Sequence, residues 1–156
     1  MATTTRAIPS CPFHHAGRDG SIWKRKLVGR RRLCQFANRG YLYVVISGKQ
    51  HAVHRLVLEA WRGKPSAAQR HTRHIDGDRA NNRLANLAWA TVKENAADRR
   101  LHMAAARLRC TGWSTRRIAR RLGLPHGVVL SVVRRRCRRV VGAPNDFRVY
   151  PREQGA

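Results

Sequence analysis

The chain has 156 residues and carries 33 lysines and arginines against eight aspartates and glutamates, which gives a formal net charge of +25. Such a charge excludes most ordinary metabolic enzymes, because so many like charges on a small core repel one another unless a polyanion neutralises them. Only five of the 33 cations are lysines, and arginine favours bidentate contacts with phosphate. Nucleic acid is therefore the first expected partner, ahead of an anionic membrane surface or an acidic protein.

The sequence gives no sign of a membrane or a secreted location. No apolar run approaches the ~18 residues of a membrane span, and the first residues lack the apolar segment of a signal peptide. We therefore expect a cytoplasmic protein of a bacterial host cell with no membrane partner. The four cysteines form no CxxC pair, which favours reduced thiols over disulfides or a zinc site.

The N-terminal third of the chain reads as an arm followed by short strands. Residues 1–18 mix Pro, Thr, Gly and His without periodicity and predict an irregular arm. Strands are expected at residues 21–23 and 41–46, with a return strand at 51–53 after a Ser-Gly turn. A helix over about residues 54–62 should follow, because apolar residues recur there at helical spacing and a Gly and a Pro come directly after it.

The middle of the chain predicts a strand, a turn, a second strand and a helix. Asp76 and Gly77 mark the turn, and residues 86–90 alternate Leu87 and Trp89 on one side of the second strand. Thr91 and Glu94 then form a Thr-x-x-Glu capping box, so a helix is expected over residues 92–110.

Two further helical segments predict a helix-turn-helix over residues 103–139. Ser114 or Thr115 caps the first segment, Gly123 ends it, and residues 126–136 form the second. Residues 140–156 are expected to be a flexible tail.

The segment over residues 74–95 reads HIDGDRANNRLANLAWATVKEN and resembles the HNH endonucleases of the phage and intron-associated homing type. Its matching elements are His74, Asp76-Gly77, Asn81-Asn82, Asn86-Leu87, Trp89, Thr91 and Asn95. The resemblance covers about residues 19–100, with its core at 66–100, and implies an α+β protein. Its expected parts are a small N-terminal β-meander and helix, a ββα-metal core and an appended helix-turn-helix. The arginine-rich, lysine-poor composition fits a phage or mobile-element origin.

The resemblance also implies an activity, which is cutting or nicking DNA with a divalent metal ion, Mg²⁺ or Mn²⁺. His74 takes the position of the general base, and a neutral imidazole is suited to removing a proton from water. Asn95 takes the position of a metal ligand. Asn86 is expected to tie back the loop and orient His74.

Arg73 departs from the family pattern, because the residue before the base is a metal-ligating Asp, Asn or His in many relatives. Three interpretations follow. Asp76, Asp78 or water completes the coordination of Mg²⁺; Arg73 itself supplies positive charge to the phosphate; or the site is degenerate and the protein only binds DNA.

Double-stranded DNA is the expected partner, and no protein partner is indicated. Arginine clusters are expected to contact phosphates, whereas four residues on or beside the last helical segment are candidates for reading bases. The candidates together are Arg30, Arg31, Arg32, Arg116, Arg117, Arg120, Arg121, His126, Ser131, Arg134 and Arg135. Besides a nuclease, the sequence is compatible with a non-catalytic DNA-binding protein and with a basic RNA-binding protein. A monomer and a homodimer both remain open.

Overall fold

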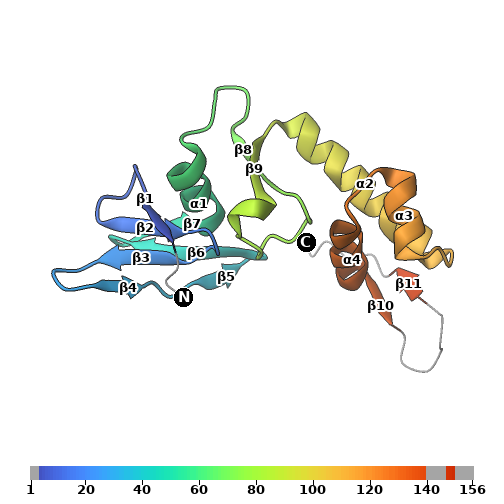
Figure 1. Cartoon of the computed structure of the whole chain (residues 1–156), viewed down its shortest axis with the longest axis horizontal. Coiled ribbons are helices and arrows are strands. Elements are labelled where there is room, and N and C mark those ends of the chain that lie inside the picture. Colours follow the sequence, from blue (N-terminus) through green and yellow to red (C-terminus); the bar gives the residue numbers. More distant parts are fainter. Residues whose placement is uncertain (1–3, 140–146, 150–156) are drawn as a thin grey trace. The chain divides into compact units, whose positions relative to one another are not determined.

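The computed structural model describes residues 4–139 and 147–149. The fold is α+β, as the sequence predicts, and combines several small antiparallel sheets with helices (Figure 1). The chain divides into two compact units, one made of Met1–Ile75 and Arg79–Asn95 and the other of Asp76–Asp78 and Ala96–Ala156. No helix in the described part of the chain is long and apolar enough to cross a membrane.

The first unit begins with a four-stranded antiparallel sheet. It has the order β1-β2-β3-β4, and its strands are β1 (Thr5–Ala7), β2 (His14–Gly17), β3 (Ile22–Arg25) and β4 (Arg30–Arg32). The expectation that residues 1–18 form an irregular arm is therefore wrong over β1 and β2. Strands of three and four residues are too short to show a hydrophobic period, and their order comes from pairing: Arg6 lies opposite Ala16 in the ladder.

A three-stranded sheet follows, with β5 (Phe36–Asn38), β6 (Tyr41–Ile46) and β7 (Lys49–Ala52) in sequence order. The predicted meander is confirmed for β6 and β7. Ser47 and Gly48 both have positive φ, at 49° and 76°, which is the backbone of the tight hairpin turn expected there.

Helix α1 (Val53–Arg62) carries the largest share of the core of this unit. Val53, Val57 and Leu58 are fully buried, and the cluster that they join includes Ile22 and Val44 from the two sheets. The predicted end of the helix is confirmed at Gly63, whose φ of 77° interrupts the helical backbone. The core therefore connects α1 to strands that precede it in the chain.

A hairpin and a helix complete the arrangement that the family resemblance implies. β8 (His71–His74) pairs with β9 (Leu87–Ala90), a 3-10 turn at Leu84–Asn86 enters the second strand, and α2 (Val92–Cys110) follows. The capping box is confirmed: the Glu94 carboxylate accepts from the Thr91 N–H at 2.7 Å, and the Thr91 hydroxyl accepts from the Glu94 N–H at 3.2 Å. Leu87 is fully buried and Trp89 packs against the core, as predicted.

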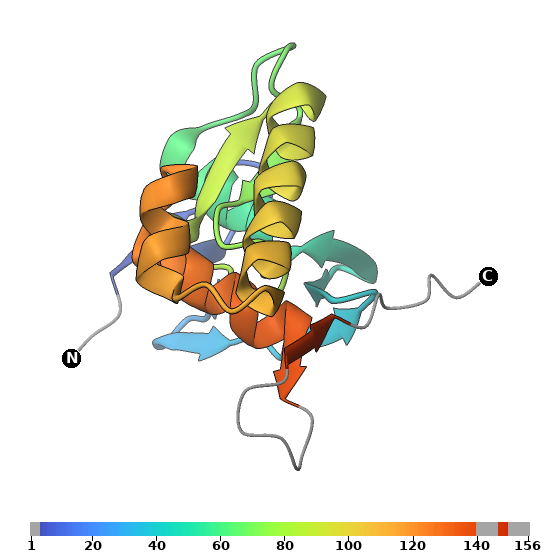
Figure 2. The ribbon, with the colours of Figure 1, turned by 90° about the vertical axis from the view of Figure 1, so that its right-hand side faces the viewer.

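The second unit contains most of α2, then α3 (Thr115–Leu122), α4 (His126–Arg136), β10 (Cys137–Arg139) and β11 (Phe147–Val149) (Figure 2). Ser114 caps α3 by accepting the N–H of Arg117, and Gly123 ends it in the left-handed conformation. The expected flexible tail is wrong at residues 147–149, which pair with β10 through their backbone. The rest of residues 140–156 lies outside the described residues.

Candidate active site

His74 is the last residue of β8 and lies opposite Leu87 in the hairpin. The next backbone bond, from the Ile75 N–H to the Asn86 carbonyl at 2.9 Å, closes the ladder at this end. The imidazole is half-buried, and its Nε2 lies 3.2 Å from Oδ1 of Asn82. Because an amide oxygen only accepts hydrogen bonds, Nε2 of His74 is the donor in this contact.

Two other rings surround His74. The ring of His54, at the start of α1, meets it edge-on with centroids 5.3 Å apart, and the Tyr41 ring of β6 lies 6.1 Å away. Tyr41 and His54 are themselves 5.2 Å apart. We refer to Tyr41, His54, His74 and Asn82 as the histidine cluster. Its members come from a sheet, a helix, a strand and a loop, so only the tertiary fold assembles it.

His54 is held in its neutral form. Burial, together with the nearby His74 and Arg55, lowers the pKa of His54 to about 4. Only 8% of its surface is exposed, and its buried Nδ1 has no hydrogen-bond partner among the residues that the structure describes. An uncharged ring at this place limits the local positive charge next to His74.

The buried state of His54 predicts an acid-labile fold. Its pKa in the folded protein is below the ordinary value of 6.5, so the unfolded chain binds the proton first as the pH falls. At neutral pH the ring is neutral in both the folded and the unfolded chain, so it does not affect stability. As the pH falls from 6.5 to about 4, the free energy of unfolding decreases by up to about 3 kcal/mol. Urea unfolding, followed by tryptophan fluorescence, should be measured at pH 6.5 and at about pH 4. The free energy of unfolding should decrease less between these two values for His54→Phe than for the wild type.

The control for this measurement is His71→Phe, because His71 is exposed and begins the same strand that ends in His74. It should keep the pH-dependent loss of the wild type. Equal losses in His54→Phe and in the wild type would show that His54 does not carry the effect.

Asn82 is positioned by a close approach of the N-terminal sheet. It is 4% exposed, and a Cβ placed on Gly20 would lie only 2.9 Å from the Asn82 carbonyl oxygen. Gly20 has a φ of 90°, which side-chain-bearing residues rarely adopt. A second tie joins the same two segments, since the Leu84 N–H donates to the Arg18 carbonyl at 2.8 Å. The loop that holds Asn82 is therefore fixed from outside the hairpin.

Asn86 acts on the same loop. Its Nδ2 donates to the carbonyl of Asn81 at 2.9 Å, while its own carbonyl receives the N–H of Ile75. The sequence names Asn82 only as part of the matched motif and does not identify Asn82 or His54 as a neighbour of His74. The sequence contained a signal for Asn82, because it belongs to the matched motif. It contained none for His54, because a contact between residues 20 positions apart produces no local pattern.

Asn95 and Arg73 flank the carbonyl of Thr72. The Asn95 amide Nδ2, in the first turn of α2, lies 3.4 Å from that carbonyl oxygen. Arg73 is half-buried on β8. The pKa of the exposed Glu94 is lowered, first by its hydrogen bonds from Thr91 and then by the charge of Arg73. A cation therefore stands near the first turn of α2.

The donor set in this region does not fit a preformed metal site. Among residues 4–139 and 147–149, no group of three or more His, Cys, Asp or Glu side chains could hold a metal ion. Arg73 offers only donors, and the amide of Asn95 offers a single oxygen. Mg²⁺ requires oxygen ligands, usually with at least one carboxylate.

Asp76 and Asp78 already have structural contacts. Oδ1 of Asp76 accepts the Asp78 N–H at 2.7 Å, which stabilises the turn, and the Asp78 carboxylate pairs with Arg135 at 3.2 Å. Arg135 also donates to the Asp76 carbonyl.

Several candidate base-reading residues of the second unit have partners within the unit. The His126 ring bonds the Thr115 hydroxyl at 2.9 Å, and Arg135 donates to the Ser131 hydroxyl at 3.0 Å. Other candidates are exposed, and these are Arg116, Arg117, Arg120, Arg121 and Arg134. Arg117 also stacks over Trp113 at 3.8 Å. The exposed arginines of α3 therefore present a cationic surface in this unit.

Comparison with known proteins gives three findings. Residues 51–97 match a family model described as HNH endonuclease. The uncharacterized HNH endonuclease L245 of Acanthamoeba polyphaga mimivirus is 40% identical over 60 residues, a match that spans 36% of this chain and only 18% of that relative. A solved structure described as DNA binding and cleavage by the HNH homing endonuclease I-HmuI matches with a TM-score of 0.53 and 19% identity, covering 95% of this chain and 99% of that chain. At this level of identity, the likeness concerns the fold.

Proposed function

We propose that this protein is a DNA endonuclease or nickase that hydrolyses phosphodiester bonds with His74 as the general base, because residues 51–97 match the HNH endonuclease family model. The observation that carries the proposal is the histidine cluster. It holds the His74 ring through Asn82, next to a neighbour that stays neutral. The family match covers the segment that contains His74, and the histidine cluster supports the same imidazole.

His74 performs the first proton transfer in the proposed mechanism. The contact of Nε2 with Asn82 orients the ring, and the imidazole removes a proton from a water molecule, which attacks phosphorus. The 3′ oxygen leaves and takes a proton from solvent water, so the products carry a 5′ phosphate and a 3′ hydroxyl. Asn86 supports this step indirectly by holding the loop that presents Asn82.

The family as a whole uses a divalent metal ion, and Mg²⁺ or Mn²⁺ is the ion that the sequence implies. Asn95 and Asp76 are the candidate ligands, but their surroundings do not form a preformed site. Of the three interpretations of Arg73, we favour the one in which its guanidinium faces the phosphate and supplies positive charge. The charge of Arg73 near the first turn of α2, which also carries Asn95, supports this choice.

Double-stranded DNA is the proposed substrate. Exposed arginines on β4 and on α3 supply phosphate contacts in the two units separately, and α3 and α4 have the order and the turn of a helix-turn-helix. Such contacts give affinity and register on the duplex without reading its sequence.

A second candidate function is DNA binding without cleavage. The observation that favours it is Arg73, because a cation replaces a metal-ligating residue. One experiment separates the two functions. Supercoiled plasmid is incubated with the protein in Mg²⁺, in Mn²⁺ or in EDTA, and nicked and linear forms are read on a gel. Nicked circles support the endonuclease, whereas retarded but intact supercoils support the non-catalytic protein.

Arg73 can be tested by a series at one position. Arg73→Lys keeps a positive charge and should retain most of the nicking rate, while Arg73→Ala should lower it by about tenfold, the value of a charge-assisted contact. Arg73→Asp restores a carboxylate. If nicking by this variant becomes faster and requires less Mg²⁺ than the wild type, the position is a metal-ligand position and the proposed role of the guanidinium is wrong.

A further inference from the structure

The hairpin of β3 and β4 ends in two apolar side chains that the fold does not use. Leu27 and Val28 occupy the turn and are 108% and 92% exposed, the highest values among the large apolar residues exposed in the described chain. The Lys26 N–H closes the turn by donating to the Gly29 carbonyl at 3.1 Å, and Gly29 supplies the positive φ of 75°. Turns normally carry Gly, Pro, Asn, Asp or Ser at their tips. Neither turn geometry nor core packing explains these two residues.

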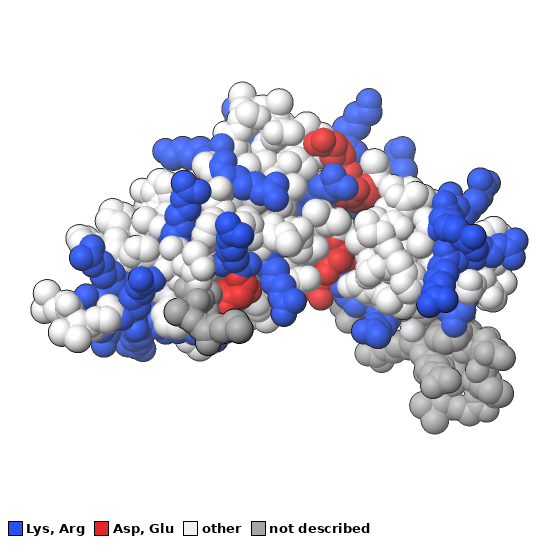
Figure 3. Space-filling model, in the orientation of Figure 1, with Lys and Arg blue, Asp and Glu red and all other residues white. Residues whose placement is uncertain are grey.

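Cations surround this apolar tip. Residues 24–32 are all exposed, and six of these nine residues carry positive charge, with no carboxylate among them: Lys24, Arg25, Lys26, Arg30, Arg31 and Arg32. In the ladder, Arg25 lies opposite Arg30 and Lys24 opposite Arg31. Figure 3 shows basic side chains along this hairpin, whose far end is uncharged. Like charges placed directly opposite one another destabilise a hairpin, so a polyanion is the expected occupant.

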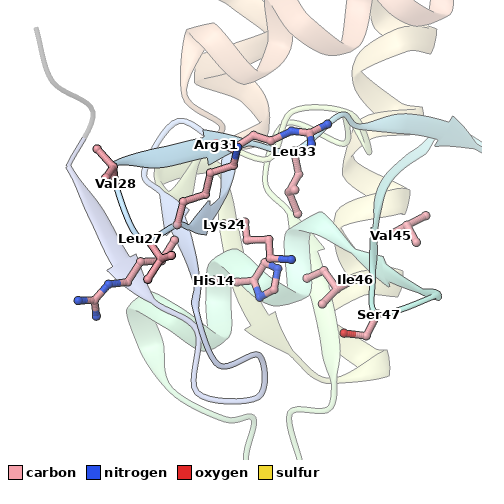
Figure 4. Close-up of a pocket in the computed structure, with 11 residues that line it drawn as sticks. His14, Lys24, Leu27, Val28, Arg31, Leu33, Val45, Ile46 and Ser47 are labelled. Atoms are coloured by element: carbon pink, nitrogen blue, oxygen red, sulfur yellow. The ribbon is translucent and has the colours of Figure 1, made fainter.

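A hollow of about 730 Å³ lies beside the tip. Leu27 and Val28 line one side of it and Val45 and Ile46 another, and Lys24 lies between them (Figure 4). The hollow therefore lies between the β3–β4 hairpin, with its apolar end and cationic sides, and β6 of the three-stranded sheet.

We propose that Leu27 and Val28 form a wedge that inserts between base pairs of double-stranded DNA, while the surrounding lysines and arginines of the hairpin bind the phosphates on either side. Apolar wedges of this kind unstack a base step and bend the duplex, and the exposed phosphates then reach more of the protein. The inference rests on the proposed function, since it needs DNA as the substrate. It adds that the protein deforms DNA through the unit that carries His74.

Duplex DNA fits the hairpin better than a lipid surface does. An anionic membrane would accept the same apolar tip and charges, but the hairpin belongs to the compact unit that contains the histidine cluster and most of the family-matched segment. A wedge that bends DNA has a use in that unit, because bending widens access to one phosphate.

The test measures bending in the full-length protein. Duplexes shorter than the persistence length of DNA carry a donor dye at one end and an acceptor at the other, and energy transfer is read on binding in EDTA. The variants are L27S/V28S, which removes the apolar surface, and L27K/V28K, which also adds charge. The control is Val92→Ser, which removes an exposed apolar residue outside the hairpin. Thermal unfolding checks that all variants fold.

We expect the wild type and Val92→Ser to raise energy transfer, and both double variants to lose this change. L27S/V28S should bind DNA about tenfold more weakly than the wild type, because the apolar contact is lost while the cost of unstacking the bases is no longer incurred. L27K/V28K should regain affinity through its added charges without bending the duplex. An equal bend in all four proteins, with cleavage intact, overturns the wedge alone. If both double variants lose the binding of the wild type to phosphatidylserine–phosphatidylcholine vesicles but still bend DNA as the wild type does, the tip binds membranes and the wedge is wrong. Absence of any duplex binding by the wild type overturns the proposed function and the wedge together.

Discussion

Replacing His74 by alanine should lower the rate of plasmid nicking by about 10²–10⁴-fold, the usual contribution of a general base. Duplex binding should remain close to that of the wild type, because the exposed arginines that would contact phosphate lie on β4 and α3. The measurement pairs a nicking time course with a gel-shift titration on the same DNA. A parallel loss of binding would show that the residue holds the fold rather than the proton.

Two further variants sharpen this prediction. His71→Ala removes a histidine from the exposed beginning of the same strand and should leave nicking unchanged. Adding free imidazole to His74→Ala should restore part of the rate, since a small base can enter the space that the side chain leaves. Near-normal nicking by His74→Ala without imidazole would remove His74 from the role of general base.

Gly20→Ala should destabilise the first unit and slow nicking together. The added methyl group would meet the carbonyl oxygen of Asn82 at 2.9 Å, and alanine would also have to adopt a φ of 90°. The backbone strain alone costs about 1–3 kcal/mol, and relief of the clash must move the residue that bonds His74. We therefore expect a lower midpoint in urea unfolding and, at temperatures where the variant is folded, a lower kcat.

The matched control is Gly48→Ala. Gly48 has a similar φ of 76°, but a Cβ placed there meets nothing within 4 Å. It should show the cost of the positive φ without any effect on the rate of nicking. If the two variants lose kcat equally, the contact between Gly20 and Asn82 does not support the site.

The parts of the fold that the sequence predicts well are those with local causes. The capping box of α2, the stop of α1 at Gly63 and the turn at Ser47-Gly48 each depend on residues within a few positions of one another. Their chemistry is visible in the sequence because the same residues make the contacts. Leu87 was likewise identifiable as core from strand alternation alone.

The parts that the sequence missed depend on distant pairing. β1 and β2 contain too few residues to show a period, yet Ile8 and Ala16 are buried because α1 and the sheet cover them. The same reason explains the histidine cluster. The motif identified His74, but the neighbours His54 and Tyr41 come from elements formed 20 and more residues earlier in the chain.

Arg135 illustrates a further limit of the sequence. Its place on α4 made it a candidate for reading bases, but its guanidinium pairs with Asp78 and donates to Ser131. A cluster of arginines looks uniform in a sequence, whereas each guanidinium in a fold has its own surroundings. The roles of His74, Arg73, Asn86 and Asn95 remain predictions for the experiments above.

The hydrophobic core that α1 shares with the two N-terminal sheets has a practical consequence for protein engineering. Its buried members before residue 51 are Ile8, Cys11, Ala16, Ile22, Val44 and Ile46, and they pack with Val53, Leu56, Val57 and Leu58 of α1. Excision of the family-matched segment as a portable cassette would leave the apolar side of α1 open to water and invite aggregation. A transplant of this nuclease into another protein would have to carry both upstream sheets with it.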